Sequence, residues 1–461
     1  MTEADSRAGR IADRIARSID EGQLNTGARL PSIRAAAREY GVSKNTVVEA
    51  YDRLVATGYL SPRRGSGFYV AYRRRSEPSA PPEHFTEAID LVSLLREQLN
   101  RHYTVRAGDG RPPTSWMETS ELGRYLKRTG RQGEAEDDFE YGHPQGFPPL
   151  RETVARTLGE RGISAGPEQV LLTFGANHAL DLLVRHFVEP GDTVLVETPG
   201  YYPLFGKLRL NKARIAGVRR GPDGPDLAEL EQRIREYRPR LMFVQPMAHN
   251  PTGTDMSLAA MHRLLQIAER HDLILIEDDA FADILPRSTP RLAALDALQR
   301  VIYLGTFSKT LSAALRSGFI AADPRLIASL TDIKMLTVVT SSGAIERLIH
   351  DMIVRGRYRR HLTRLRDRVA RASAAGVTAL ESIGITGIEP PTGGYYLWCP
   401  LPEGLDDVAV ARRASAEGIF LAPSSIFHQS EEHRPPALRI NVAHAADERL
   451  LDFLRRETAG R

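Results

Sequence analysis

The chain has very little cysteine, with a single residue, Cys399, among 461. One cysteine excludes a disulfide within the chain and a zinc site built from several thiolates. Long hydrophobic runs are also absent, because apolar stretches such as residues 273–277 are far shorter than the roughly 20 residues that span a bilayer. The first ten residues carry charges and lack the apolar centre of an export signal. We therefore expect a cytoplasmic protein without membrane segments.

The length and composition indicate a folded protein with more than one core. A chain of 461 residues exceeds the size at which a single hydrophobic core stops growing. Its basic residues are unevenly placed, since residues 1–75 hold 14 Lys and Arg against 8 Asp and Glu, whereas the remainder holds 48 against 50. This asymmetry favours a small basic module that faces a polyanion, attached to a larger domain without that need.

The N-terminal segment follows the pattern of three short helices and a hairpin. The first helix, over residues 7–21, has isoleucines four positions apart, which predicts one buried face. The second can begin at Pro31, and the third follows Ser43, whose hydroxyl can cap it; each ends at a glycine. Two strand-like runs after residue 58 enclose a basic, turn-rich tip, which predicts a wing.

Three motifs in this segment occur in a fixed order: Leu30-Pro31-Ser32-Ile33-Arg34, Gly41-Val42-Ser43-Lys44-Asn45-Thr46-Val47 and Gly65-Ser66-Gly67-Phe68-Tyr69-Val70. Residues 7–72 thereby resemble the GntR-type winged helix. The resemblance implies that the third helix lies in the major groove, where Asn45 can read adenine, Thr46 can touch a thymine methyl and Lys44 can attract phosphate. Ser43 taken alone is an ordinary helix cap. The residues implied to contact double-stranded DNA are Arg34, Ser43, Lys44, Asn45, Thr46, Arg63, Arg64 and Gly65.

A stretch rich in proline and charge, residues 73–86, predicts a linker between this segment and the rest. Beyond it, short apolar runs alternate with helical stretches, which predicts a largely parallel sheet covered by helices on both faces. We therefore predict an α/β chain with a winged helix-turn-helix over residues 1–72, the linker over 73–86 and a larger domain over 87–461.

The strongest chemical signal is a lysine that follows an apolar strand, in Gly305-Thr306-Phe307-Ser308-Lys309-Thr310-Leu311 and then Leu315-Arg316-Ser317-Gly318. The hydroxyls of Thr306 and Ser308 and the guanidinium of Arg316 are the donors that a phosphate dianion needs beside an imine-forming lysine. From residue 87 onward the chain resembles fold-type I, aminotransferase-like proteins. The resemblance implies pyridoxal 5′-phosphate as the cofactor and Lys309 as the residue that carries it.

Further motifs extend this resemblance: Glu277-Asp278-Asp279 at a strand end, Asn250-Pro251-Thr252-Gly253 between two strands, and Gly175-Ala176-Asn177 before a helix. They imply that Asp278 meets the pyridine nitrogen, that Asn250 donates to the phenolic oxygen, and that the helix start receives the phosphate. Tyr201 matches the aromatic residue that stacks on the ring. The residues implied to bind the cofactor are Lys309, Asp278, Asn250, Tyr201, Gly175, Ala176, Asn177, Thr306, Ser308, Arg316 and Phe281.

Two residues are implied to bind an effector, and one position departs from the pattern. Arg439 matches the arginine that grips a substrate carboxylate, and Tyr141 begins a segment that borders the substrate site. Phe281 stands where related enzymes have a tyrosine whose hydroxyl bonds the phenolic oxygen, so strong catalysis is in doubt. Tyr202 is a candidate to supply the missing hydroxyl.

A GntR-type winged helix before an aminotransferase-like domain is the layout of the MocR subfamily of regulators, which the chain resembles over nearly its full length. The resemblance implies a homodimer that binds DNA and senses an amino compound by aldimine exchange at Lys309. The coupling of this exchange to DNA binding is a hypothesis. Two alternatives stay open: a working aminotransferase with an accessory DNA module, and a regulator that answers to pyridoxal phosphate itself.

Overall fold

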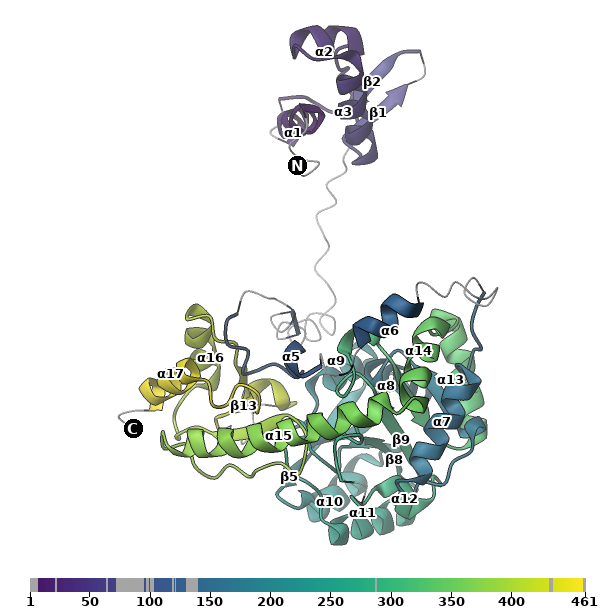
Figure 1. Ribbon diagram of the computed structural model, residues 1–461, viewed down its shortest axis with the longest axis vertical. Coiled ribbons are helices and arrows are strands. Elements are labelled where there is room, and N and C mark those ends of the chain that lie inside the picture. Colours follow the sequence, from purple (N-terminus) through teal and green to yellow (C-terminus); the bar gives the residue numbers. More distant parts are fainter. Residues whose placement is uncertain are drawn as a thin grey trace. The chain divides into compact units, whose positions relative to one another are not determined.

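The chain divides into two compact units, Met1–Pro81 and Pro82–Arg461, each with its own hydrophobic core. Figure 1 draws the computed structural model. It describes residues 7–20, 23–63, 65–71, 95–96, 99, 103–117, 120, 122–129, 140–286, 288–430 and 434–458. The predicted linker, residues 73–86, lies outside the described residues, so its extent stays a prediction.

The first unit is a winged helix-turn-helix, as the sequence predicted. Its elements are α1 (Arg7–Asp20), α2 (Ile33–Glu39), α3 (Lys44–Ala56), β1 (Leu60–Arg63) and β2 (Gly67–Val70). The two strands pair antiparallel, with Leu60 opposite Val70, and form the wing. Isoleucines of α1, with Val47, Tyr51 and Leu54 of α3, build the core.

Serine caps fix where the second and third helices begin. Ser32 is extended and its hydroxyl accepts from the Ala35 amide, so α2 starts two residues after Pro31 rather than at it. Ser43 caps α3 in the same way through the Thr46 amide. The Tyr51 hydroxyl donates to the Pro31 carbonyl at 2.9 Å, which ties α3 to the segment before α2.

The second unit is built on an eight-stranded sheet of order β3-β10-β9-β8-β7-β4-β5-β6. The strands are β3 (Val170–Thr173), β4 (Thr193–Thr198), β5 (Arg214–Gly221), β6 (Gly224–Pro225), β7 (Leu241–Val244), β8 (Ile274–Asp278), β9 (Val301–Thr306) and β10 (Gly318–Ala321). The pairs among β5, β4, β7, β8 and β9 are parallel, whereas β10 and β6 pair antiparallel. The predicted, largely parallel sheet is confirmed.

Helices cover both faces of this sheet (Figure 1). The helices of this unit are α5 (Thr114–Met117), α6 (Leu122–Thr129), α7 (Pro148–Gly159), α8 (Ala176–Phe187), α9 (Tyr202–Leu210), α10 (Leu227–Tyr237), α11 (Leu258–Arg270), α12 (Leu292–Asp296), α13 (Pro324–Val338), α14 (Gly343–Val354), α15 (Arg357–Glu381), α16 (Asp407–Ala416) and α17 (Glu448–Thr458), with short 3-10 turns at Pro167–Gln169, Ala313–Leu315 and Ser424–Phe427; α16 and α17 lie beside the smaller sheet described below. Along β9, Ile302 and Leu304 pack with α8, α9 and α13, while Val301 and Tyr303 pack with the helices opposite. Two buried faces explain the uninterrupted apolar runs.

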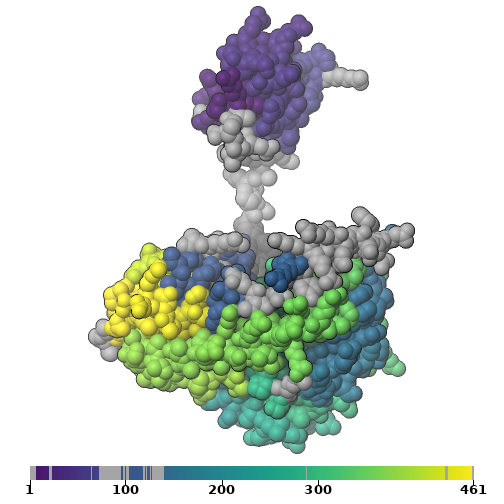
Figure 2. Space-filling model, viewed as in Figure 1, coloured from purple at the N-terminus to yellow at the C-terminus, as the bar shows by residue number. Residues whose placement is uncertain are grey.

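A second, smaller sheet lies near the C-terminus. It joins β11 (Tyr396–Pro400), β13 (Ala437–Asn441) and β12 (Ala422–Pro423) in the order β11-β13-β12, all antiparallel. The long helix α15 runs from the large sheet toward this one (Figure 1), and the C-terminal residues, yellow in Figure 2, cover the same end. Within the described ranges, none of the helices is both long and apolar enough to cross a membrane.

Candidate functional site

The residues that the sequence singled out in the second unit meet where the parallel strands end. Asp278 is the last residue of β8, Lys309 follows β9 by three positions, and the loop after β7 carries Asn250. They line a cavity of about 500 Å³. Among the predicted residues, its lining includes Ala176, Asn177, Tyr201, Asn250, Asp278, Phe281, Thr306, Ser308, Lys309, Arg316 and Arg439. Carboxyl ends of parallel strands are the usual place for ligands in such sheets.

Lys309 is held at both its backbone and its amine. Its Nζ donates to the Gly110 carbonyl at 2.6 Å and lies 3.5 Å from the Tyr396 hydroxyl. The Tyr395 hydroxyl donates to the Lys309 carbonyl at 2.6 Å. The lysine amine therefore points into the cavity with two polar neighbours, neither of which the sequence analysis had named.

A cradle for an anion lies beside the lysine. Arg316 donates from Nη1 to the Ser308 hydroxyl at 3.2 Å and from Nη2 to the Phe174 carbonyl at 3.1 Å. Gly175 precedes α8 with a φ of 76°, and a Cβ added there would lie 3.0 Å from Arg316 Nη2. The glycine thus lets the guanidinium reach the N-terminus of α8, where backbone N–H groups and the helix dipole favour a phosphate.

The two neighbouring aspartates, Asp278 and Asp279, differ in their hydrogen-bond partners. The Asp278 Oδ1 atom is buried and has no hydrogen-bond partner among the described residues. Burial, and then the Asp279 carboxylate, raise the pKa of Asp278 to about 7. Asp279 instead accepts from Arg291 Nε at 2.7 Å and from the Tyr303 hydroxyl at 2.8 Å. An unpaired carboxylate facing the cavity fits a protonated ring nitrogen.

Arg439 and Asn250 join the small sheet to the large one. Arg439 Nη1 donates to Asn250 Oδ1 at 2.9 Å, and Nη2 donates to the Gly108 carbonyl at 2.8 Å. The guanidinium carbon lies 4.5 Å from the centre of the Tyr396 ring, and the Nε atom is buried without a partner among the described residues. The guanidinium is therefore fixed in orientation and still has N–H groups to offer a carboxylate.

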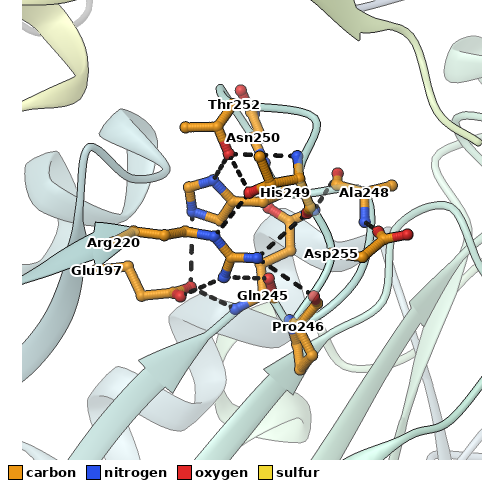
Figure 3. A network of polar contacts seen from close by, with 10 residues as sticks. Glu197, Arg220, Gln245, Pro246, Ala248, His249, Asn250, Thr252 and Asp255 are labelled. Atoms are coloured by element: carbon orange, nitrogen blue, oxygen red, sulfur yellow. Dashed lines mark hydrogen bonds and ion pairs between the residues drawn. The ribbon is translucent and has the colours of Figure 1, made fainter. Parts of the chain in front are cut away.

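A buried network holds the loop that carries Asn250 (Figure 3). Glu197 forms an ion pair with Arg220 and accepts from the Gln245 amide at 2.7 Å. The Gln245 side-chain oxygen accepts from the Asn250 amide at 2.9 Å, and the loop is further closed by a hydrogen bond of 2.8 Å between His249 and Thr252. Of these residues, the sequence assigns a functional role only to Asn250, and the Glu197–Arg220 pair joins two different strands, a contact that no local pattern reveals.

Phe281 and Tyr141 lie in contrasting places. Phe281 is buried, and its ring packs edge-on against Tyr395 and Tyr396. The hydroxyl next to Lys309 belongs to Tyr396, whereas Tyr202 packs edge-on against Phe427. Tyr141 is 79% exposed and is not part of the cavity lining. A single copy of the chain therefore does not bring Tyr141 to Lys309.

In the first unit, the described residues predicted to contact DNA lie in α2, at the start of α3 and around the wing. Arg34, Lys44, Asn45 and Arg63 are exposed. The Ser43 and Thr46 hydroxyls bond each other at 2.9 Å, so both take part in the helix cap. Gly65 has a φ of 76°, which suits the tight wing turn, and Arg64 lies outside the described residues.

Comparison with known proteins decides the family. The model for bacterial regulatory proteins of the gntR family matches residues 7–70, and the model for aminotransferase class I and II matches residues 103–456. The probable rhizopine catabolism regulatory protein MocR of Rhizobium meliloti is 31% identical over 439 residues, which cover 92% of this chain and 87% of that protein. The chain belongs to the MocR-type transcription regulators.

Solved structures resemble the aminotransferase-like unit of this MocR-type chain. Kynurenine aminotransferase of Pyrococcus horikoshii matches with a TM-score of 0.73 and 24% identity over 84% of this chain and 96% of its own. LysN, the α-aminoadipate aminotransferase of Thermus thermophilus, complexed with N-(5′-phosphopyridoxyl)-L-leucine, matches with a TM-score of 0.72 and 31% identity over 81% of this chain and 97% of its own. The family's cofactor is pyridoxal phosphate, as the sequence predicted, and the unpaired Asp278 oxygen and the Arg316 cradle fit it.

Proposed function

We propose that the protein is a DNA-binding transcription regulator whose aminotransferase-like unit senses an amino compound by exchange at Lys309. The observation that carries this proposal is the meeting of Lys309, Asp278 and Arg439 in one cavity of a chain that also has a GntR-type winged helix. Pyridoxal phosphate supplies an aldehyde carbon that an incoming amine can occupy in place of the lysine. As a DNA-binding regulator the protein acts in the cytoplasm.

The residues around Lys309 favour an effector that has both an amine and a carboxylate. Asp278 keeps the cofactor ring nitrogen protonated, and Arg316, Ser308 and the start of α8 hold its phosphate. Arg439 has two N–H groups engaged by Asn250 and Gly108, so the others remain for the effector's carboxylate. A buried guanidinium discriminates strongly, because a ligand without the carboxylate leaves the remaining N–H groups unpaired.

At the DNA end, α3 enters the major groove in this proposal. Lys44 and Asn45 are exposed at its first turn, and Arg34 and Arg63 flank it from α2 and the wing. Because the Ser43 and Thr46 hydroxyls bond each other, their main task is to cap the helix, with the Thr46 methyl free to touch a base. Gly65 in the wing turn and Arg64, the residue before it in the sequence, complete the proposed set.

A homodimer fits both units. The end of α13 exposes apolar side chains at Met335, Leu336, Val338 and Val339, with Leu336 exposed by 89%. Such a patch is unusual on a monomer and is covered by a second copy in this proposal. Tyr141 lies near the same end, since a Cβ on the adjacent Gly142 would lie 3.6 Å from the Ser341 carbonyl. We propose that Tyr141 borders the effector site of the other copy.

Spectroscopy of the full-length holoprotein tests the proposal. Amino acids are added one at a time while the visible band of the lysine-bound cofactor and the affinity for DNA from upstream of the protein's own gene are followed. We expect one compound to shift the band persistently and to change DNA affinity in the wild type but not in Lys309→Ala. Bleaching that a keto acid reverses identifies instead a working aminotransferase, which the intact Lys309, Asp278 and Arg439 favour. A response of DNA affinity to pyridoxal phosphate alone identifies a cofactor sensor.

A further inference from the structure

The amine of Lys309 occupies a small polar site made by Gly110 and Tyr396. The Gly110 carbonyl accepts from Lys309 Nζ at 2.6 Å and from the Tyr396 hydroxyl at 3.0 Å, while Nζ and that hydroxyl are 3.5 Å apart. The three atoms thus form a closed triangle. Tyr396 is 1% exposed, so its hydroxyl makes these contacts in a largely buried setting, where hydrogen bonds are stronger than in water.

The position of Tyr396 is fixed by aromatic and cationic neighbours. Its ring packs edge-on against Phe281, with the ring centres 5.5 Å apart, and the Arg439 guanidinium lies over its face. Phe281 contributes no hydroxyl, so the phenol next to Lys309 comes from β11 of the small sheet instead of from the loop after β8. The same ring therefore touches the proposed carboxylate anchor and, through its hydroxyl, the lysine amine.

We infer that the Gly110 carbonyl and the Tyr396 hydroxyl form a receiving site that holds the Lys309 amine whenever the lysine is not bound to the cofactor. This inference deepens the proposed function. Its prediction about effector binding rests on that function, whereas its prediction about cofactor binding does not. In the exchange, a carbon–nitrogen bond forms to the incoming amine and the bond to Nζ breaks. The hydrogens lost by the incoming nitrogen end on Nζ, so the step needs no oxidant or further reactant.

A receiving site has opposite effects on two equilibria. Cofactor binding to the cofactor-free protein must take the amine out of the site, whereas effector binding puts the amine back into it. Removing the Tyr396 hydroxyl therefore strengthens cofactor binding and weakens effector binding by the same factor. A general defect of packing would weaken both.

Tyr396→Phe and Tyr395→Phe form a matched pair for the test. Both phenols are buried, both rings pack against Phe281, and each hydroxyl bonds Lys309 or its receiving carbonyl. The Tyr395 hydroxyl, however, holds the lysine backbone, which stays in place in both states. Tyr395→Phe thus controls for the loss of a buried phenol hydroxyl. We expect it to lower the melting temperature, which is measured for each variant.

Two titrations of the full-length protein are measured for the wild type and each variant. One gives the dissociation constant of pyridoxal phosphate, and the other gives the half-saturating concentration of methylamine, which displaces the lysine without needing Arg439. For Tyr396→Phe we expect about three- to tenfold tighter cofactor binding and a matching rise in the methylamine concentration, the effect of one hydrogen bond. The inference is overturned if Tyr396→Phe leaves the cofactor dissociation constant and the half-saturating methylamine concentration unchanged, or if it weakens the binding of both ligands. If no amine displaces the lysine in the wild type, the proposed sensing fails, while the cofactor titration still tests Tyr396.

Discussion

Asp278 and Asp279 are adjacent and buried, yet their replacement by asparagine should have opposite effects on the cofactor-free protein. The pKa of Asp278 rises from its ordinary value of 3.8 to about 7, chiefly through burial and then through the Asp279 carboxylate. Because the folded state holds this proton more tightly than the unfolded state, stability is lost as the pH rises from about 4 to 7. The shift corresponds to at most about 4 kcal/mol, at 1.36 kcal/mol for each pKa unit.

Asp278→Asn removes this penalty, so at pH 8 the cofactor-free variant should be more stable than the wild type by up to about 4 kcal/mol. At pH 5 the difference should fall to about 2 kcal/mol, because the carboxyl is then neutral in the folded state while the unfolded chain is only about one pH unit above its ordinary pKa. Asp279→Asn breaks a buried ion pair with Arg291 and a hydrogen bond with Tyr303, and should cost about 3 kcal/mol or more. With pyridoxal phosphate present, Asp278→Asn should bind the cofactor at least about tenfold more weakly, because the ring nitrogen loses its counter-charge.

Urea unfolding followed by tryptophan fluorescence measures these differences. The chain has two tryptophans, and both Trp116 and Trp398 belong to the second unit, so the signal reports on the unit that holds the site. Destabilisation of Asp278→Asn at pH 8 to the same degree as Asp279→Asn would refute the assignment of an unpaired, cofactor-facing carboxylate to Asp278.

Three further variants test other parts of the molecule. Lys44→Ala should weaken DNA binding evenly across sequences and lower the slope of log affinity against log salt by about one, measured by fluorescence anisotropy; an unchanged slope contradicts a phosphate contact. Arg439→Lys should raise the half-saturating concentration of a carboxylate-bearing effector roughly tenfold and leave that of methylamine unchanged, and equal shifts for both ligands argue against a carboxylate anchor. Glu197→Gln should destabilise the second unit by about 3 kcal/mol in urea, because the buried charge of Arg220 is left without a carboxylate to balance it; a change below about 0.5 kcal/mol means that the network does not hold the loop.

Much of the fold could be predicted from the sequence because its signals are local. The apolar runs of β4, β7, β8 and β9 are buried on both faces, and the sequence of each strand shows this pattern without reference to the others. The start of α2 shows the limit of such signals. Pro31 is suited to a first helical turn, but Ser32 supplies a cap, and the capped start lies two residues later.

The candidate site likewise contains some residues that local sequence signals predict and others that they do not. Asp278 and Lys309 lie at strand ends that the sequence marks, whereas Tyr396 and Gly110 reach Lys309 from segments 87 and 199 residues away. Their contact with the lysine depends on how the small sheet packs against the large one, and no local periodicity encodes that packing. The exposure of Tyr141 belongs to the same class, because its surroundings depend on more than one copy of the chain in the proposed assembly.

The contact between Arg439 and Asn250 links the proposed effector site to the interface between the two sheets. Arg439 lies on β13 of the small sheet, and Asn250 lies on a loop of the large sheet that the Glu197–Arg220 pair holds in place. A carboxylate that arrives at Arg439 accepts from the N–H groups that Asn250 and Gly108 leave unused, while the amine of the same ligand sends Lys309 toward Tyr396 of the small sheet. Both events act on the interface between the two sheets, so an effector with both groups biases their packing more than either group alone. A ligand that fills only the amine position should therefore displace the lysine and yet change DNA affinity little.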